Sequence, residues 1–394
     1  MKPKVLIGFA ECIPAPEVAW SLLDAGFDVA AFTRRGTKPL LRRCRDVEII
    51  PVDAPEDDVD AALSDFERAI VESRARVLLP LDDQSLWLSG KIDVRNGVVS
   101  APGRGHVRVA LDKRLQIEQA RDAGFPVAPT QLGTAAEIRA NREVSYPLFL
   151  RPANAIEQRG SALKRTGGAV CADDAEFDGV LEEFDDTTLI AQPLLRGTSE
   201  GLFGIANGTG VHAWSAHRRI RMVDPQGSGS SACVSTAVPD DLVTPATRFI
   251  DRTAWKGMFM FEVLRDDRGV PWFVEFNGRA WGSMALARRM GFEYPAWAAR
   301  TAIDGASGFD PPAIREGLVC RHLGLEIFHA VAVLRGPRSR ALEWPSRRQT
   351  LRDLLTVHRD QTWYNLEPGR RMIFVEDTAR AVGQVLRRLS RRLR

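Results

Sequence analysis

Short apolar runs alternate with longer segments of helical periodicity over residues 4–105. A continuous apolar run of about four to eight residues predicts a buried strand, and apolar residues that recur every three or four positions predict a helix. The alternation indicates a small parallel sheet with crossover helices. The expected strands are 5–9, 29–32 and 77–80, and the expected helices are 17–25 and 59–73.

The pattern changes after the glycine- and proline-rich segment 101–105, which predicts a boundary. A helix is expected over 111–124, because Gly124 and then Pro126 follow its last apolar position. An extended linker and a compact α+β unit ending at residue 195 come next. The expected elements of this unit are helices at 135–141 and 175–184 and strands at 148–151, near 169 and at 188–192.

A larger antiparallel region is predicted over residues 201–275. The apolar runs 257–264 and 272–279 are separated by the turn sequence Asp-Asp-Arg-Gly, which favours a β-hairpin. A helix at 283–290 closes the region, and mixed helix and strand signals follow. The chain is therefore expected to form four units, 1–105, 106–195, 196–305 and 306–394.

Length and composition are typical of a soluble protein with several domains. With 394 residues, of which 44% are apolar, the chain can fill two or three hydrophobic cores. No apolar run reaches the length of a bilayer span and the N-terminus lacks a signal-peptide core, so we expect a cytoplasmic protein without a membrane span. Five scattered cysteines without a C-x-x-C pair are typical of reduced structural thiols.

The charge of the chain is unevenly distributed. Its net charge is only +3, but residues 335–394 contain fifteen arginines against six acidic residues. The last ten residues, VLRRLSRRLR, predict an amphipathic helix of the kind that contacts nucleic acid, an acidic membrane surface or a partner chain. Such a helix is more often a solvated cap, so no nucleic-acid partner is expected.

The predicted hairpin carries the side chains that suggest chemistry. Glu275 and Asn277 are two residues apart and therefore lie on one face of their strand, and Glu262 is the carboxylate of the other strand. They offer the oxygen ligands that Mg2+ (or Mn2+) prefers, and Arg279 follows where it would face a phosphate. A solvated polar edge is the alternative. It is disfavoured because Glu262 stands among Met, Phe, Val and Leu, where an unpaired carboxylate is costly.

The sequence lacks one nucleotide-binding motif and carries the parts of another. Its first strand is not followed by the glycines of G-x-G-x-x-G, which argues against a nicotinamide dehydrogenase. Five segments in order, Asp112-Lys113, YPLFLRP at 146–152, IAQPLLRG at 190–197, Glu262, and EFNGR at 275–279, resemble motifs of the ATP-grasp superfamily. The resemblance spans about residues 1–300. Residues 275–295 are especially similar to carboligases related to the carbamoyl-phosphate synthase large chain.

The resemblance implies a fold class and a set of site residues. The fold is an N-terminal Rossmann-like α/β domain followed by two α+β lobes that clamp ATP. Lys113 and Arg151 correspond to the cations that bind its phosphates, a task that suits two fixed positive charges, and residues 153–161 correspond to a flexible loop that covers them. The remaining implied roles are adenine contacts at Gln192 and Leu195, ribose binding at Glu200, metal binding at Glu262, Glu275 and Asn277, and phosphoryl stabilisation at Arg279.

The activity that the resemblance implies is that of an ATP-dependent ligase. A substrate carboxylate attacks ATP, forms an acyl phosphate and is joined to an amine, with release of ADP and phosphate. Arg219 and Arg221, two apart on a predicted strand, would neutralise the carboxylate or the transferred phosphoryl group. An ATP-dependent carboxylase or carbamoyl-phosphate-forming enzyme and a catalytically degenerate nucleotide-binding protein stay open as alternatives. We expect ATP and Mg2+ as cofactors, small-molecule acid and amine substrates and, because family members are often dimers, a homodimer.

Overall fold

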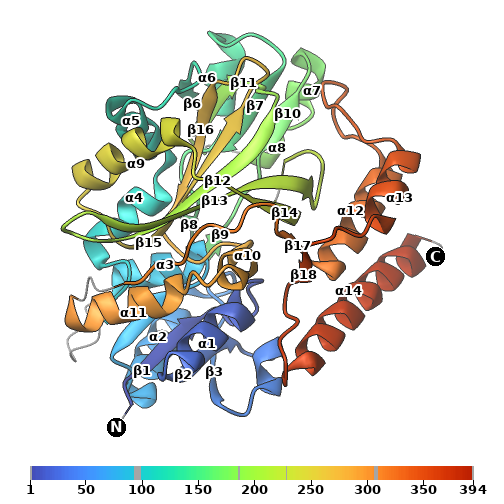
Figure 1. Cartoon of the computed structure of the whole chain (residues 1–394). Helices are drawn as coiled ribbons and strands as arrows, with labels where there is room; N and C mark the ends of the chain where they lie inside the picture. The colour runs from blue at the N-terminus through green and yellow to red at the C-terminus, as the bar shows by residue number, and fades with distance from the viewer. Residues whose placement is uncertain (1, 93–98, 185–186, 228, 306–308, 393–394) are drawn as a thin grey trace.

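The chain folds around three sheets and a separate two-stranded hairpin, as Figure 1 shows for this computed structural model. The structure describes residues 2–92, 99–184, 187–227, 229–305 and 309–392. Two of the sheets are antiparallel or nearly so, and the first one is parallel. The mixed α/β architecture that the sequence predicts is therefore confirmed.

The parallel sheet is built by the N-terminal residues, with strand order β3-β2-β1-β4-β5. Val5 and Ile7 of β1 pack on the side of α1, and Leu6 packs on the side of α2, so the strand is apolar on both faces. Chain order reverses between β1 and β4, which brings the loops after these two strands together. The elements are β1 (Lys4–Gly8), α1 (Ala15–Asp24), β2 (Asp28–Arg34), η1 (Leu40–Arg43), β3 (Val47–Val52), α2 (Val59–Ser73), β4 (Val77–Pro80), α3 (Asp83–Lys91) and β5 (Val99–Ser100).

The five elements predicted for this region are confirmed, and β3 and α3 were missed. In β3 the apolar residues are interrupted by Glu48 and Pro51, and α3 contains a glycine and several polar residues. Its helix start is instead fixed by Asp82, whose side chain accepts a hydrogen bond from the backbone of Ser85. Short helices η2 (Arg104–His106) and α4 (Val107–Leu111) lead out of the unit.

A four-stranded antiparallel sheet of order β10-β7-β11-β6 forms the next unit. Helix α5 begins where the side chain of Asp112 accepts two backbone N–H groups, and it ends at Gly124 with φ 98°. The single helix predicted at 175–184 is divided at Gly179. The elements are α5 (Lys113–Ala123), β6 (Gln131–Gly133), α6 (Ala135–Ala140), β7 (Leu148–Pro152), β10 (Ala169–Cys171), α7 (Asp174–Asp178), α8 (Leu181–Phe184) and β11 (Leu189–Pro193).

The segment expected to be a loop over the phosphates leads into the hairpin of β8 (Glu157–Arg159) and β9 (Ala162–Lys164). Ile156 and Leu163 pack on Val59 at the start of α2. Two backbone hydrogen bonds of 2.7 Å, Val59 N to Ser161 O and Leu163 N to Pro55 O, join the hairpin to the N-terminal unit. The structure therefore holds this segment against the parallel sheet's helices.

The largest sheet has seven strands in the order β16-β15-β12-β13-β14-β17-β18. One face packs with α5 and α9, and the other packs with α10 and α11. Strands β17 and β18 come from the last part of the chain and extend this sheet. The elements are β12 (Thr198–Asn207), β13 (Val211–Met222), β14 (Ser230–Thr236), α9 (Asp240–Arg252), β15 (Lys256–Arg265), β16 (Pro271–Asn277), α10 (Met284–Arg289), α11 (Tyr294–Asp304), β17 (Val319–Arg321) and β18 (Gln361–Trp363).

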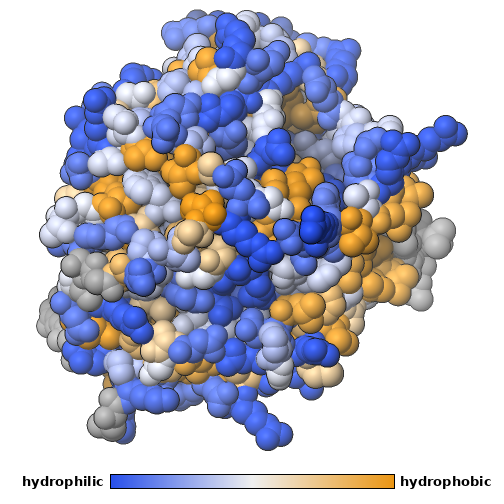
Figure 2. Space-filling model, in the orientation of Figure 1, coloured by the Kyte–Doolittle hydropathy of each residue, from blue (hydrophilic) through white to orange (hydrophobic). Residues whose placement is uncertain are grey.

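Three helices form one flank of the molecule: α12 (Leu323–Arg335), α13 (Arg347–Leu355) and α14 (Arg371–Arg392) (Figure 1). The amphipathic helix predicted for the last ten residues is the end of the much longer α14, and residues 393–394 lie outside the described part. Figure 2 shows apolar side chains at the surface on this flank. The division of the chain at residues 105, 195 and 305 stays a prediction.

A buried ion cluster joins the first, middle and last parts of the chain. Glu17 of α1, 1% exposed in its side chain, lies 2.7 Å from Arg288 and 3.0 Å from Arg289 of α10. Its Oε1 also accepts the backbone N–H of Asn365 at 3.1 Å. Because a buried carboxylate is costly unless it is paired, these contacts fix how the three segments meet.

We expect Glu17→Ala to lower the free energy of unfolding by about 3 kcal/mol, because it leaves buried arginine charge without this partner. Arg288 keeps Asp24 and Glu293, each at 3.1 Å, so the loss stays near the lower end for a broken buried pair. Urea unfolding would measure the change. The control is Glu72→Ala, which removes an exposed ion pair with Arg68 and should change little. Equal effects of the two variants would contradict the prediction.

Candidate functional site

A row of residues crosses four neighbouring strands of the large sheet. Glu275 of β16 stands opposite Glu262 of β15, Glu262 opposite Gly201 of β12, and Gly201 opposite His217 of β13. Directly opposite residues project to the same face of a sheet. Asn277, two positions after Glu275, lies beside the row, so the three predicted metal ligands converge as the hairpin pattern indicated.

Each carboxylate of the row is matched by a cation. Lys113 Nζ, from the first position of α5, donates to Glu275 Oε2 at 2.7 Å. Arg219 lies 2.6 Å from Glu262 Oε2. Burial raises the pKa of Glu275, but the charge and hydrogen bond of Lys113 outweigh burial, so its pKa is lowered overall. Glu275 is therefore held as a carboxylate.

The residues present suit a hard divalent cation. Asn277 Nδ2 lies 3.4 Å from Glu262 Oε1, and a half-turn of that amide would present Oδ1 to the same space. The donor set is then two carboxylates and one amide oxygen, which Mg2+ accepts together with water and phosphate oxygens. Within the described ranges no cluster of three or more His, Cys, Asp or Glu side chains could hold a metal ion. The donor chemistry of Glu262, Glu275 and Asn277 makes this mixed set the candidate metal site.

Arg151 links this row to the small four-stranded sheet. Its side chain is 6% exposed and donates to the backbone oxygen of Val274 at 3.0 Å and to Gln192 Oε1 at 3.4 Å. Burial lowers the pKa of Arg151, and the charges of Glu275 and Glu262 oppose this effect. Gln192 in turn donates to Thr130 Oγ1 at 2.9 Å, and Leu195 follows in the segment between β11 and β12. Lys113 and Arg151 thus bring positive charge to the carboxylates, and Gln192 contacts Arg151.

Arg279 contacts the N-terminal unit rather than the carboxylate row. Its Nε donates to Asp83 Oδ1 at 2.5 Å, and Arg165 from the chain after β9 lies 3.6 Å from Asp83 Oδ2. Burial raises the pKa of Asp83, but the charges of Arg279, Arg165 and Lys113 outweigh it and lower the pKa to about 2. The same pairing raises the pKa of Arg279 despite its burial. Asp83 thus joins three units at one point.

Sequence reasoning missed Asp83 and Arg165. A signal for Asp83 was present, because Asp82 and Asp83 follow the apolar strand β4, and ligands of open parallel sheets gather at the carboxyl ends of strands. Arg165 is exposed and stands in a polar segment, and only the docking of the β8–β9 hairpin brings it to Asp83.

Two predicted residues lie away from the row. Glu200 stands opposite Val263, one position from the Gly201–Glu262 pair, so its side chain projects to the other face of the sheet. There it binds Arg265 at 3.0 Å, which does not bring it near the residues proposed for the nucleotide. The structure therefore does not bring Glu200 together with the other predicted site residues, and its assignment to ribose stays a prediction.

Arg221 is the second displaced residue. The pairing of β13 with β14 shifts register between Arg219 and Arg221, and this irregularity separates the two side chains. Arg219 contacts Glu262, whereas Arg221 lies 3.0 Å from Glu326 of α12. Burial lowers the pKa of Arg221, and the charge of Glu326 opposes this. Arg221 thus belongs to the contact between the sheet and the C-terminal helices, and the expectation that both arginines serve one anion is corrected.

His217 adds an unexplained polar group to the row. It is 1% exposed, and neither ring nitrogen has a hydrogen-bond partner within the described chain. Burial and then the charge of Arg219 lower its pKa to about 3, so the imidazole is neutral. The ring occupies the space left by Gly201, where a Cβ would lie 2.8 Å from Nε2. A buried unpartnered imidazole in the same row as two carboxylates is a candidate contact for a substrate.

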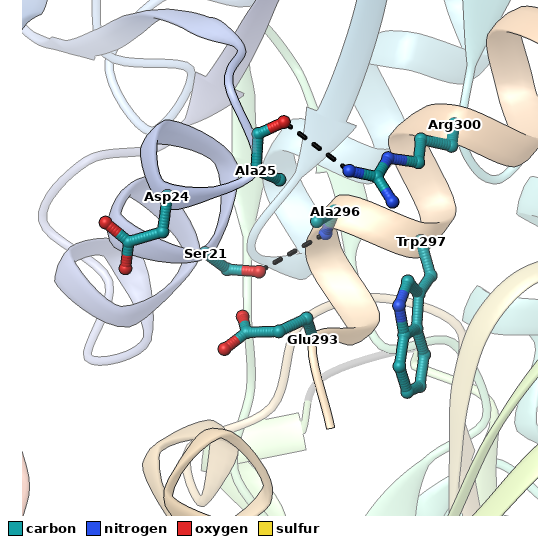
Figure 3. Close-up of a pocket in the computed structure, with 7 residues that line it drawn as sticks. All are labelled: Ser21, Asp24, Ala25, Glu293, Ala296, Trp297 and Arg300. Carbon is teal, nitrogen blue, oxygen red and sulfur yellow. Dashed lines mark hydrogen bonds between the residues drawn. The ribbon is translucent and has the colours of Figure 1, made fainter. Parts of the chain in front are cut away.

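A cavity of about 230 Å³ lies between α1 and α11, away from this row (Figure 3). It is smaller than the roughly 300 Å³ of ordinary ligand pockets. Its acidic side chains already pair with Arg288, and Arg300 donates to the backbone oxygen of Ala25 at 3.5 Å. We do not assign the nucleotide site to it. Its lining residues are Ser21, Asp24, Ala25, Glu293, Ala296, Trp297 and Arg300.

Among the helices that the structure describes, none has both the length and the apolar character needed to cross a membrane.

Comparison with known proteins identifies the fold. No protein-family model matches the sequence. No curated protein matches it either. Solved structures do match in fold, over 81% of this chain. They include an L-amino acid ligase from Bacillus licheniformis, which is 16% identical over 78% of its own length with a TM-score of 0.62.

Two further neighbours lead to the same fold. A biotin carboxylase–ATP analogue complex from Campylobacter jejuni is 16% identical over 74% of its length, with a TM-score of 0.61. An N5-carboxyaminoimidazole synthetase from Staphylococcus aureus is 14% identical over 82% of its length, with a TM-score of 0.58. All three neighbours are ATP-grasp enzymes. The chain therefore has the ATP-grasp fold, as its motifs predicted.

The pairing of Asp83 predicts a dependence of stability on pH. Its pKa is about 2 in the folded protein and 3.8 as an ordinary value, so the unfolded chain takes up a proton first as pH falls. The pairing stabilises the fold fully above about pH 5, and about 2 kcal/mol is lost as pH falls toward 2. We expect the difference in unfolding free energy between wild type and Asp83→Asn to shrink over this range. Urea unfolding at pH 6 and pH 2.5 would test it, and a constant difference would contradict the assignment.

Proposed function

We propose that the protein is an ATP-dependent ligase that activates a carboxylate as an acyl phosphate and joins it to an amine. The observation that carries the proposal is the row of Glu262 and Glu275 with Asn277 beside it, surrounded by Lys113, Arg151 and Arg219 in an ATP-grasp fold. Oxygen ligands and fixed cations in one place suit a metal-bound polyphosphate.

The nucleotide lies between the small sheet and the large sheet in this proposal. Lys113 and Arg151 bind its phosphates, and Gln192 with the backbone at Leu195 contacts the adenine. Glu262, Glu275 and Asn277 would hold Mg2+, which neutralises charge on the phosphates when it is bound. Lys113 and Arg219 then exchange their carboxylate partners for phosphate oxygens. Because the positive groups are held in place beforehand, little reorganisation is needed during the reaction.

The chemistry proceeds in two displacements. An oxygen of the substrate carboxylate attacks the γ-phosphorus, and the bond to the bridging oxygen of ADP breaks, which gives ADP and an acyl phosphate. The amine nitrogen then attacks the carbonyl carbon, phosphate leaves and the nitrogen loses a proton. Arg279 stabilises the transferred phosphoryl group, and Asp83 orients Arg279. Alignment of the reactants can supply on the order of 7 to 11 kcal/mol of the barrier.

A phosphate-release screen of carboxylic acids, each paired with amino acids and other amines, tests the proposal. Release of ADP and phosphate that requires both an acid and an amine supports it. ATP binding without ADP formation for every pair would support the degenerate nucleotide-binding protein instead.

An ATP-dependent carboxylase or carbamoyl-phosphate-forming enzyme is the second candidate. It is favoured by neighbours that include a biotin carboxylase domain solved with bicarbonate. ADP release that bicarbonate stimulates without any amine would select it. Because both reactions use ATP, we further propose that the protein acts in the cytoplasm. We also propose that it is a homodimer.

We expect Glu275→Gln to abolish ADP release while the fold is kept, because the amide is a poorer metal ligand and cannot pair with Lys113. Glu200→Gln is the matched control, since Glu200 lies on the opposite face of the same sheet and should retain most turnover. A coupled ADP assay with circular dichroism measures both. Turnover by Glu275→Gln at the wild-type rate would rule out the metal assignment.

Arg279→Ala should lower turnover at saturating ATP by about 100-fold or more, since removal of a group that stabilises transition-state charge has effects of this size. Nucleotide affinity should change far less. Isothermal titration with ATP and steady-state kinetics separate the two quantities. Lost ATP binding with unchanged saturated turnover would make Arg279 a binding residue only.

A further inference from the structure

The flank formed by α12, α13 and α14 exposes an unusual share of the large apolar side chains. Twelve such residues are exposed in the described chain, and eight of them lie between Leu334 and Leu386. Figure 2 shows apolar side chains on the side where Figure 1 draws these helices. Exposed apolar residues that gather in one region indicate an interaction surface.

Helix α14 has one face that is already covered. Ile373 and Ala381 are buried, and Gly324 of α12 allows close approach because a Cβ there would lie 2.9 Å from Ala381. Glu376 receives hydrogen bonds from Arg42 at 2.9 Å and from Arg43 at 2.5 Å, both in η1. This inner face explains why α14 is attached to the protein, and it leaves the opposite face without a role.

The outer face carries a regular apolar stripe. Its exposed members recur at alternating intervals of three and four residues, and at 3.6 residues per turn they fall within a sector of roughly 80°. Leu389 and Leu393 continue the same intervals in the sequence. These intervals are the a and d positions of a heptad repeat, which the described members sustain over two heptads. The members are Met372, Val375, Ala379, Val382 and Leu386.

The width of the stripe decides what it fits. A helix that lies on a membrane or on a globular core has an apolar face wider than about 100°, whereas a narrow a/d stripe is the seam of a coiled coil. Such a seam requires a second helix with the same repeat. Another copy of this chain supplies one, and a two-fold axis closes the contact because both copies use the same surface.

We propose that two copies of the protein pair through the outer stripes of their α14 helices as an antiparallel coiled coil. Charge sets the direction. The sequence from Arg387 to Arg394 contains five arginines and no acidic residue, and a parallel pair would place these two ends side by side. In the antiparallel pair each basic end lies beside the first half of the other helix, which contains both acidic residues of α14, Glu376 and Asp377.

Sedimentation equilibrium of the full chain without substrate tests the pairing, so its outcome does not depend on the proposed reaction. Wild type should be a dimer at micromolar concentration. Val382→Glu with Leu386→Glu should be a monomer with unchanged circular dichroism, because two charges would be buried in the seam. Val71→Glu, which changes an exposed valine of α2, is the control and should stay dimeric. A monomeric wild type, or a double variant that stays dimeric, would overturn the proposal.

Cross-linking tests the direction. Antiparallel a–d packing places Val375 beside Leu386 of the other copy, whereas parallel packing places Val375 beside its own equivalent. Mild oxidation of a mixture of Val375→Cys and Leu386→Cys proteins should give cross-linked dimers, and Val375→Cys alone should not. Wild type serves as the background control for its five free cysteines. Cross-linking of Val375→Cys with itself would refute the antiparallel arrangement.

If wild type is monomeric and instead sediments with vesicles of anionic lipid, the stripe is a lipid-binding face and the pairing is overturned.

Discussion

Two carboxylates face each other on adjacent strands, and much of the structure around them serves to make that arrangement stable. Glu262 and Glu275 are directly opposite in the β15–β16 pair, where like charges destabilise a sheet. Lys113 and Arg219 compensate them from two other elements, at 2.7 and 2.6 Å. Helix α5 and strand β13 thus each supply a cation that offsets the charge of this strand pair.

The same pairing explains how the proposed site can be ready for a nucleotide without one. Lys113 and Arg219 each already have a carboxylate partner, and Arg279 has Asp83. Exchange of partners replaces one set of charge-assisted contacts by another, so binding does not have to create charged groups in a buried place. His217 is the exception, because it has lost water without gaining a partner among the described residues. A cost of about 1 to 3 kcal/mol for such a group is most simply recovered when a ligand reaches it.

For the candidate site, local periodicity predicted which side chains converge within one strand pair, but not how residues of other strands and units are placed. The convergence of Glu262, Glu275 and Asn277 needs only the two-residue period of a strand and one hairpin turn, and the structure has both. Glu200 required the register of a third strand, because a shift of one residue reverses the face of every side chain. Arg221 required a register irregularity that no local pattern announces. Asp83 and Arg165 required the docking of separate units, which is a tertiary property.

In the C-terminal helix α14, the high arginine content drew attention away from a regular pattern of apolar residues. Fifteen arginines in the last sixty residues direct attention to charge and to anionic partners. Burial separates the two faces that the sequence mixes. Ile373 and Ala381 turn inward, and the exposed apolar positions keep a strict alternation of three and four residues. An inward face needs apolar residues for packing, but packing on α12 and η1 does not account for a second stripe on the opposite side. A surface that is solvated throughout would favour polar residues at those positions, so the alternation is best explained by a partner helix of the same period.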